Sequence, residues 1–585
     1  MTIVQNGTLV TPGGMLQADL AMEDGKITAI APGLPAQGAA RVDASGCWVF
    51  PGFLDGHTHL DLNNGVMNTA DDFASGTTAA VCGGTTTICD FATQDKGGTL
   101  MDALAAWKQK AAGVSRCNYA FHMAITDWNE RTRAELGALR AAGVSSFKAY
   151  FAYDALRVRD DELLEILEAI RPFGGILGVH CENGDVVNAM QRRAIAGGRT
   201  GVENHPRTRP PEVEAEAIDR LCWLGRMAGM PVHVVHLSTA LGLDVIRAAR
   251  RRGQTVYAET CPQYLLLDES RYLLPGFEGA KYVMSPPLRS PNDVAALRRA
   301  VENGEISTIS TDHCSFRFAD QKAFGRDDFT KIPNGAPGIE HRPALMFSSF
   351  GGVLNAMQLC DLLSTNAAKL FGMYPRKGAL AVGSDADVVV WDPGAQWTIT
   401  AQNQHQAVDY IPYEGFAATG RAKYVFVNGI LAAENGEPSR VCAGRYVARY
   451  SLIQKGRIPM NQAVSTSNAP SAIGPYSQAI RSGNTIYVSG QLPIDPATGA
   501  FAGEDIAAQT RQSLTNIGNI LAAAGFSMKD VVKTTVLLKN IADFGAMNEV
   551  YATFFTEPFP ARAAFQAAAL PRDALVEIEC VAVKQ

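Results

Sequence analysis

The chain has 585 residues, which is too many for one hydrophobic core, so we expect more than two domains. Its composition, 47% hydrophobic and 19% charged residues, is typical of a soluble globular protein. Lys and Arg number 52 against 58 Asp and Glu, and a net charge of −6 without a basic block argues against nucleic acid as a partner.

The two flanks of the first 448 residues are predicted to be rich in short strands. Ile3–Val10 has Asn-Gly between apolar residues, which predicts a hairpin, and Glu23–Lys26 predicts a second turn. A similar pattern returns at Tyr424–Leu431. We therefore expect residues 1–52 and 373–448 to pair into one small β-sandwich domain.

Residues 53–372 alternate predicted strands with helices, and eight apolar, β-branched segments are predicted to be the strands. They lie at Phe53–His59, Thr86–Phe91, Asn118–Ile125, Ser146–Phe151, Ile176–Glu182, Val232–Ser238, Thr255–Cys261 and Ser307–His313. Eight strands separated by helices predict an α/β fold of the (β/α)8 barrel type, the TIM barrel. A doubly wound open sheet is the alternative, but the count of eight and the absence of a glycine-rich dinucleotide loop favour the barrel.

The last part of the chain is predicted to be a linker, 449–465, and a compact α+β domain, 466–585. Its predicted helices and strands lie at about Asp505–Ala524 and Phe544–Phe555, and at Thr485–Gly490, Val531–Leu538 and Val576–Val583.

Three features indicate a cytoplasmic protein without a membrane partner. The N-terminus, Met1–Gly7, lacks the basic and apolar regions of a signal peptide. No apolar run is long enough to span a bilayer. The 11 cysteines are scattered and include no C-x-x-C pair, which favours reduced thiols.

Polar side chains follow the predicted barrel strands at their carboxyl ends, where barrel active sites lie. They are His57 and His59, Lys148, His180, His236 and Asp312. His57 and His59 alternate along one strand and should project to the same face. A single histidine is more often a satisfied core residue, but five strands that end in this way favour a metal site. All ten histidines lie at or before His405, so such a site belongs to the first two-thirds of the chain.

Four histidines and an aspartate could hold two divalent metals if an anionic group bridges them. Burial and positive neighbours would favour the neutral amine of Lys148. A neutral lysine can react with CO₂ to give a carbamate, which has the two oxygens that a bridge requires. The alternative is a buried Lys148 that forms a salt bridge with Asp90 or Glu182.

Several motifs in residues 1–448 resemble the cyclic amidohydrolase branch of the amidohydrolase superfamily, most closely the D-hydantoinases and dihydropyrimidinases. They are Gly52–His59, Ser146–Tyr150, Val179–Asp185, Ser285–Arg289, Gly325–Gly335, Asn366–Gly372, Gly383–Asp387 and Pro412–Gly415. The resemblance covers almost all of this region, and its motifs recur in one order.

This resemblance implies two Zn²⁺ ions per subunit and a role for each matching residue. The more buried zinc would be bound by His57, His59, carboxylated Lys148 and Asp312, and the other by Lys148, His180 and His236. Asp312 would carry the proton from the nucleophile to the leaving nitrogen. Tyr153 would stabilise the oxyanion, and Ser285 and Asn334 would hold the substrate amide through backbone groups. Without the resemblance, Tyr153 is a packed aromatic residue and the other two are turn residues.

Residues 466–585 resemble the reactive-intermediate deaminase family, called Rid or YjgF-like. The matching motifs are Ala472–Gln478, Val488–Gln491, Val532–Val536, Phe559–Arg562 and Val576–Glu579. The resemblance implies a chorismate-mutase-like fold, a trimer, and hydrolysis of enamines or imines. Arg562 would clamp a substrate carboxylate and Glu577 would orient the water, with Tyr476 and Asn548 lining the pocket. The alternative is that Arg562 is a surface ion-pair residue and the domain only an oligomerisation module.

Together these patterns predict a zinc enzyme that opens hydantoin or dihydropyrimidine rings to N-carbamoyl amino acids, fused to a Rid-like domain. The partner would be a small cyclic amide or ureide. An allantoinase or dihydroorotase is the nearest alternative, and a non-catalytic dihydropyrimidinase-like scaffold is the competing class. Two-fold pairing of barrels and three-fold closure of Rid domains would together give a homo-oligomer, a hexamer with D₃ symmetry.

Overall fold

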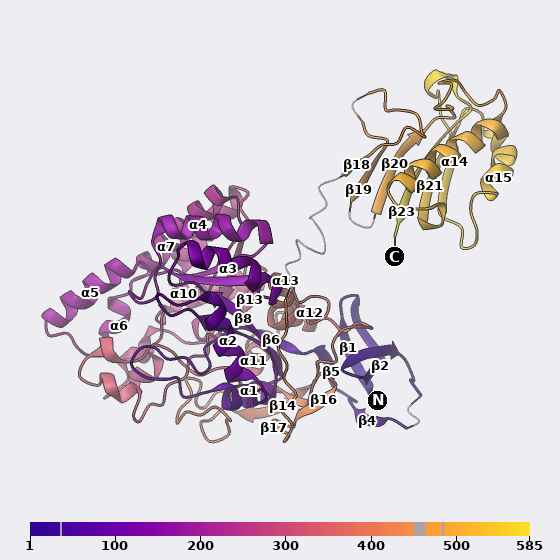
Figure 1. The fold of residues 1–585 in the computed structure, drawn as a ribbon. Coiled ribbons are helices and arrows are strands. Elements are labelled where there is room, and N and C mark those ends of the chain that lie inside the picture. The colour runs from indigo at the N-terminus through magenta and orange to yellow at the C-terminus, as the bar shows by residue number, and fades with distance from the viewer. Residues whose placement is uncertain (36–37, 450–461, 475, 483–484, 585) are drawn as a thin grey trace. The chain divides into compact units, whose positions relative to one another are not determined.

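The computed structural model describes residues 1–35, 38–449, 462–474, 476–482 and 485–584. The chain forms two compact units, Met1–Ser451 and Leu452–Gln585 (Figure 1). Most of the predicted linker, and Pro475 in a predicted Rid motif, lie outside the described residues. No helix in the described ranges is long and apolar enough to cross a membrane.

The predicted barrel is confirmed, with all eight strands in the predicted places. They are β6 (Phe53–Thr58), β7 (Thr85–Thr93), β8 (Asn118–Ala124), β9 (Ser146–Tyr150), β10 (Ile176–His180), β11 (Val232–Val234), β12 (Val256–Thr260) and β13 (Thr308–Ile309). The strands are parallel and neighbours in chain order from β6 to β13. A parallel bridge between Thr58 and His313 joins the first strand to the segment after the last. The backbone N–H of His59 also donates to the carbonyl of His313 at 2.8 Å, which nearly closes the barrel.

Helices surround the barrel and follow its strands. They are α1 (Phe73–Cys82), α2 (Leu100–Ala111), α3 (Glu130–Ala141), α4 (Asp160–Ile170), α5 (Gly184–Ala196), α6 (Asn204–Arg207), α7 (Pro211–Ala228), α8 (Ala240–Arg251), α9 (Pro262–Leu266), α10 (Pro291–Glu302), α11 (Arg342–Phe350), α12 (Ala356–Cys360) and α13 (Asn366–Leu370). Every residue of β6 and β8 is buried, as expected for parallel strands covered on both faces.

The two flanks pair into one nine-stranded sheet, as predicted. Its strands are β1 (Thr2–Thr11), β2 (Gly14–Glu23), β3 (Lys26–Ala31), β4 (Ala40–Asp43), β5 (Trp48–Pro51), β14 (Val388–Thr398), β15 (Ala417–Val427), β16 (Ile430–Glu434) and β17 (Glu437–Pro438). The flanks meet where β14 pairs antiparallel with β5. Val4 and Leu20 from one flank share a buried cluster with Val388 and Phe426 from the other.

The predicted hairpin at Asn6-Gly7 is wrong. β1 is one strand that runs through these residues, and its pairing with β2 shifts register between Val4 and Gly7. Asn6 has a φ of 62°, so it forms a bulge instead of a turn. A Cβ at Gly7 would lie 2.6 Å from Cγ2 of Val49, so a neighbouring strand packs where a side chain would be. The same dipeptide at Asn428-Gly429 does form the hairpin turn between β15 and β16.

The C-terminal unit is an α+β domain. Its elements are β18 (Gln462–Val464), β19 (Ala479–Ser482), β20 (Thr485–Gln491), α14 (Ile506–Ala523), β21 (Val531–Leu538), α15 (Phe544–Ala552), β22 (Ala561–Gln566) and β23 (Val576–Val583). The sheet order is β18-β19-β20-β23-β21-β22, and α14 lies against the sheet (Figure 1). The predicted helices and three strands are present, whereas β18, β19 and β22 were not predicted. Leu514 and Ile517 of α14 pack against Val536 and Ile578 of the strands.

Candidate metal centre and active site

The segments at the carboxyl ends of β6 and β13 bring two histidines to one aspartate. Oδ1 of Asp312 lies 3.1 Å from Nε2 of His57 and 3.2 Å from Nε2 of His59. The other ring nitrogen of His57, Nδ1, lies 2.7 Å from Oε1 of Glu259. When Nδ1 donates its proton to Glu259, Nε2 keeps a lone pair that faces Asp312. Three electron-pair donors therefore face one another and require a proton or a cation between them.

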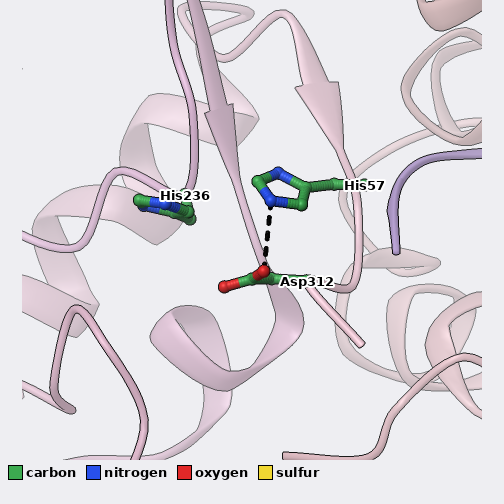
Figure 2. A group of neighbouring side chains, drawn as sticks. All are labelled: His57, His236 and Asp312. Carbon is green, nitrogen blue, oxygen red and sulfur yellow. Dashed lines mark ion pairs between the residues drawn. The ribbon is translucent and has the colours of Figure 1, made fainter. Parts of the chain in front are cut away.

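His236 completes a group that could hold a metal ion. Ligand atoms of His57, His236 and Asp312 lie within 4.8 Å of one another, and Figure 2 shows the three side chains around a common space. Nε2 of His57 and Nδ1 of His236 are buried atoms without a hydrogen-bond partner among the described residues. Buried polar atoms normally have partners, so these nitrogens fit a site that a cation completes.

Close packing under the histidine strand explains why glycine precedes His57. A Cβ at Gly56 would lie 2.7 Å from Cε2 of Phe371 and 3.3 Å from Oγ of Ser310. Asp55, on the other side of this glycine, accepts a hydrogen bond from the hydroxyl of Thr311 at 2.7 Å. The strand that carries the histidines is thus fixed to the segment that carries Asp312.

Burial and the neighbouring carboxylates decide where positive charge lies in this group. Burial acts to lower the pKa of His57, but Asp312 and Glu259 raise it to about 9. Burial lowers the pKa of His59 to about 4. Burial acts to raise the pKa of Asp312, yet His57 and His59 hold it well below its usual range. The structure therefore favours one positive charge between the two carboxylates, where a divalent cation would also be stabilised.

His180, from β10, faces His236 on the other side of the group. Its Nδ1 lies 3.0 Å from Nε2 of His236, and its Nε2 lies 2.8 Å from Oε2 of Glu182. Glu182 also accepts from Nη1 of Arg209 at 2.6 Å. Burial acts to raise the pKa of Glu182, but Arg209 and His180 keep it well below its usual range. An ionised Glu182 holds the His180 proton on Nε2 and leaves the Nδ1 lone pair directed at His236.

Lys148, from β9, is 1% exposed. Within the described residues its amine has no hydrogen bond and no carboxylate within 4.0 Å, while Asp90 accepts from Thr58 and Glu182 from Arg209. Lys148 therefore forms no salt bridge with Asp90 or Glu182 among the described residues, so the alternative interpretation is wrong. Burial lowers the pKa of Lys148 to about 8, against the opposing effect of Asp312 and Glu259.

The residues expected to contact substrate lie on the His180 side. The rings of Tyr153 and His180 are 5.1 Å apart, and burial raises the pKa of Tyr153 to about 12, so its hydroxyl stays a donor at neutral pH. Oγ of Ser285 donates to Oε2 of Glu182 at 3.1 Å. Asn334 has a buried Oδ1 without a hydrogen-bond partner among the described residues.

Three of these residues have left-handed backbone conformations. The φ angles are 68° at Tyr153, 40° at His236 and 54° at Asp312. Non-glycine residues seldom adopt such angles, and each costs on the order of 1–3 kcal/mol. The surrounding fold therefore holds these side chains in positions that the backbone would not adopt by itself.

The predicted C-terminal residues are only partly brought together. Nη1 of Arg562 donates to Oδ1 of Asn548 at 2.8 Å, and its guanidinium lies 4.6 Å from the ring of Tyr551. Tyr476 is 53% exposed. Glu577 lies on β23 and Arg562 on β22, on either side of β21. Burial, followed by Glu579, raises the pKa of Glu577.

Comparison with known proteins decides the family. Residues 48–432 match the amidohydrolase family, and residues 466–584 match the family described as endoribonuclease L-PSP. A D-hydantoinase of Geobacillus stearothermophilus is 44% identical over 455 residues, which cover 76% of this chain and 96% of the relative. This chain belongs to the amidohydrolase family. Within it, the chain is a member of the D-hydantoinase and dihydropyrimidinase group of cyclic amide hydrolases, with a Rid domain at its C-terminus.

Two further relatives support the same assignment to the D-hydantoinase and dihydropyrimidinase group. A D-hydantoinase of Rhizobium radiobacter is 42% identical and covers 74% of this chain and 95% of its own. The crystal structure of a dihydropyrimidinase from Brevibacillus agri NCHU1002 superimposes with a TM-score of 0.76 at 43% identity, covering 77% of this chain and 99% of its own.

Three residues of this amidohydrolase site were not predicted from the sequence. Glu259 lies at the carboxyl end of β12 and holds His57, so the strand-end rule that indicates the candidate ligands also applies to it. The sequence indicates Glu182 only as a possible partner of Lys148, whereas in the structure Glu182, two residues after His180, holds that histidine. Arg209 lies in a loop between α6 and α7, and no sequence pattern connects it with Glu182.

Proposed function

We propose that this amidohydrolase opens hydantoin or dihydropyrimidine rings to N-carbamoyl amino acids, using two Zn²⁺ ions bridged by a carboxylated Lys148. The observation that carries this proposal is the meeting of His57, His59 and Asp312 at 3.1–3.2 Å, with His236 beside them. Imidazole and carboxylate donors suit zinc. The buried Lys148 amine, with its lowered pKa, is suited to react with CO₂.

His57, His59, Lys148 and Asp312 would hold one metal, and Lys148, His180 and His236 the other. When bound, the metals would supply Lewis acidity for the ring carbonyl and a water of lowered pKa. Asp312 can accept the proton of that water and deliver it to the leaving ring nitrogen. The Tyr153 hydroxyl can donate to the oxygen on which negative charge develops. Ser285 and Asn334 would hold the ring amide through their backbone groups.

We further propose that the Rid domain hydrolyses enamines or imines. Support comes from Arg562, whose guanidinium is held by Asn548 and Tyr551 and is exposed on β22, where it could bind a carboxylate in two-pronged fashion. Glu577 would orient the water and Tyr476 would line the pocket.

We also propose that the protein is cytoplasmic, which is consistent with its eleven unpaired cysteines. We propose that it forms a homo-oligomer, a hexamer with D₃ symmetry. A mass measurement that gives a stable tetramer would contradict the hexamer.

A substrate panel on the full zinc-loaded chain tests the first proposal. We expect turnover of hydantoin, 5-phenylhydantoin or dihydrouracil, and not of allantoin or dihydroorotate. Turnover of only the last two would replace the proposal by an allantoinase or dihydroorotase function. An imine-hydrolysis assay on the same preparation, with Arg562→Ala as the control, tests the Rid domain.

A further inference from the structure

The backbone carbonyls around Ser285 are almost all engaged by buried side chains. In the segment 282–286, the hydroxyl of Tyr272 donates to the carbonyl of Tyr282 at 3.0 Å. Nε2 of His205 lies 2.8 Å from the carbonyl of Met284, and the hydroxyl of Tyr264 donates to that of Pro286 at 2.7 Å. The donors Tyr272, His205 and Tyr264 are 2–3% exposed. Among the described residues, only the carbonyl of Ser285 in this segment has no hydrogen-bond partner.

The carbonyl of Val283, in the same segment, accepts a hydrogen bond from a lysine with no exposed surface. Lys322 begins a short helical turn, η4 (Lys322–Gly325), and is 0% exposed. Its Nζ donates to the carbonyls of Val283 at 2.7 Å, Pro333 at 2.8 Å and Gly335 at 2.7 Å. Three acceptors match the three protons of an ammonium group. This buried amine has no carboxylate partner among the described residues, and its hydrogen bonds in these residues are confined to backbone carbonyls.

These contacts join two segments that are far apart in the sequence. Val283 lies two residues before Ser285, and Pro333 and Gly335 lie on either side of Asn334. The backbone N–H of Gly335 also donates to the carbonyl of Val283 at 3.1 Å. The same pattern appears at the second segment, because the carbonyls on both sides of Asn334 are engaged and its own backbone groups and Oδ1 have no partner among the described residues.

We infer that Lys322 is a positioning residue that holds the Ser285 and Asn334 segments together and occupies competing carbonyls, so that the backbone groups of Ser285 and Asn334 remain for the ring amide. This inference rests on the proposed function, which makes that amide the substrate. Tyr264 likewise occupies one competing carbonyl, that of Pro286. An amide needs a donor and an acceptor at fixed separation, and two loops not tied together would lose that separation.

Ser285 is connected to the candidate metal ligands through Glu182, whereas Lys322 makes no hydrogen bond to these ligands among the described residues. The side chain of Ser285 donates to Glu182, which holds His180, whereas the hydrogen bonds of Lys322 among the described residues go to backbone carbonyls. Loss of Lys322 should therefore disturb substrate binding and leave metal binding in place. A merely structural residue would instead reduce the fraction of active enzyme, which lowers kcat and leaves KM unchanged.

The test compares Lys322→Met and Tyr264→Phe with the wild-type chain and with Lys331→Met. Lys331 lies nine residues further on, is 60% exposed and, among the described residues, pairs only with Asp328 at 3.5 Å, so it is a matched control. We expect KM for the ring substrate to rise about ten-fold or more in Lys322→Met and a few-fold in Tyr264→Phe, which correspond to one or more lost hydrogen bonds. Zinc content should equal that of the wild type, and Lys331→Met should change neither value.

Tyr264→Phe keeps the inference testable if Lys322→Met does not fold, because it removes one hydroxyl at nearly constant volume. Unchanged KM in Tyr264→Phe and in any folded, zinc-loaded Lys322→Met would overturn the inference. Loss of zinc together with kcat would also overturn it, since the residue would then support the metal site. If the wild type opens no cyclic amide at all, the proposed function fails instead, and the two failures are distinguishable.

Discussion

The two candidate sites of this chain differ in how much of each is enclosed. In the barrel, His57, Lys148 and His236 are 1–3% exposed, and His57 and His180 each contact a buried carboxylate. In the Rid domain, Tyr476 is 53% exposed, and five of the six residues of β22, Arg562 among them, are exposed. The candidate site in the barrel is therefore enclosed by residues of a single chain, which also supplies the carboxylates that hold its histidines. The Rid residues lie on an open surface, which suits a site that a second copy completes.

The largest effect is expected from removal of Lys148, the centre of the enclosed site. Lys148→Ala should abolish ring opening and reduce bound zinc to well below two ions per chain, because the proposed carbamate of Lys148 would be the side chain shared by both metals. Imine hydrolysis should be unchanged in the same preparation. Metal analysis and both assays measure this. Surviving ring opening would mean that a bridging carbamate is not required.

A smaller effect is expected one contact further out, at Glu182. Glu182→Gln keeps the size of the side chain but removes the charge that holds His180 and balances Arg209. We expect zinc affinity to fall about 10- to 100-fold, as is typical when the partner of a metal-ligating histidine is lost. Glu216→Gln is the control, since this glutamate is 49% exposed and pairs with Arg220 on α7. Equal zinc affinity in both variants would show that Glu182 does not orient a ligand.

The smallest effect on the fold is expected at the open site. Arg562→Ala should abolish imine hydrolysis yet change the free energy of unfolding by no more than about 0.5 kcal/mol, because the side chain is exposed. Ring opening should be unchanged. Calorimetry and the two assays check this. A loss of ring opening in this variant would show that the two sites depend on each other.

The sequence predicted those parts of the structure that depend on local pattern. The eight barrel strands are rich in apolar and β-branched residues and almost entirely buried, with Thr93 and Tyr257 half-buried, so their composition indicates them. The candidate ligands at the strand ends are predicted from the same count, and His57, His236 and Asp312 among them do lie close together. The two Asn-Gly dipeptides show the limit, because Asn428-Gly429 turns the chain while Asn6-Gly7 only bulges it. The difference lies in Val49, which packs against Gly7 from a strand more than forty residues away.

Contacts between distant loops could not be predicted for the same reason. Arg209 meets Glu182, and Lys322 meets Val283 and Gly335, through loops whose paths are set by the whole barrel. Neither residue belongs to a periodic pattern, and a buried lysine or arginine is unusual on composition alone. Strand-end chemistry is visible in the sequence, whereas the residues that orient it become visible only in the folded chain.

The near-closure of the barrel between Thr58 and His313 sets an order of events during synthesis. His57 and His59 are among the first barrel residues to leave the ribosome, but Asp312, which faces them at 3.1–3.2 Å, is made more than 250 residues later. A nascent chain therefore cannot present the full set of candidate ligands until its last barrel strand has emerged. Metal acquired at this point would join the two ends of the barrel wall, so loading would act as a checkpoint on completed folding.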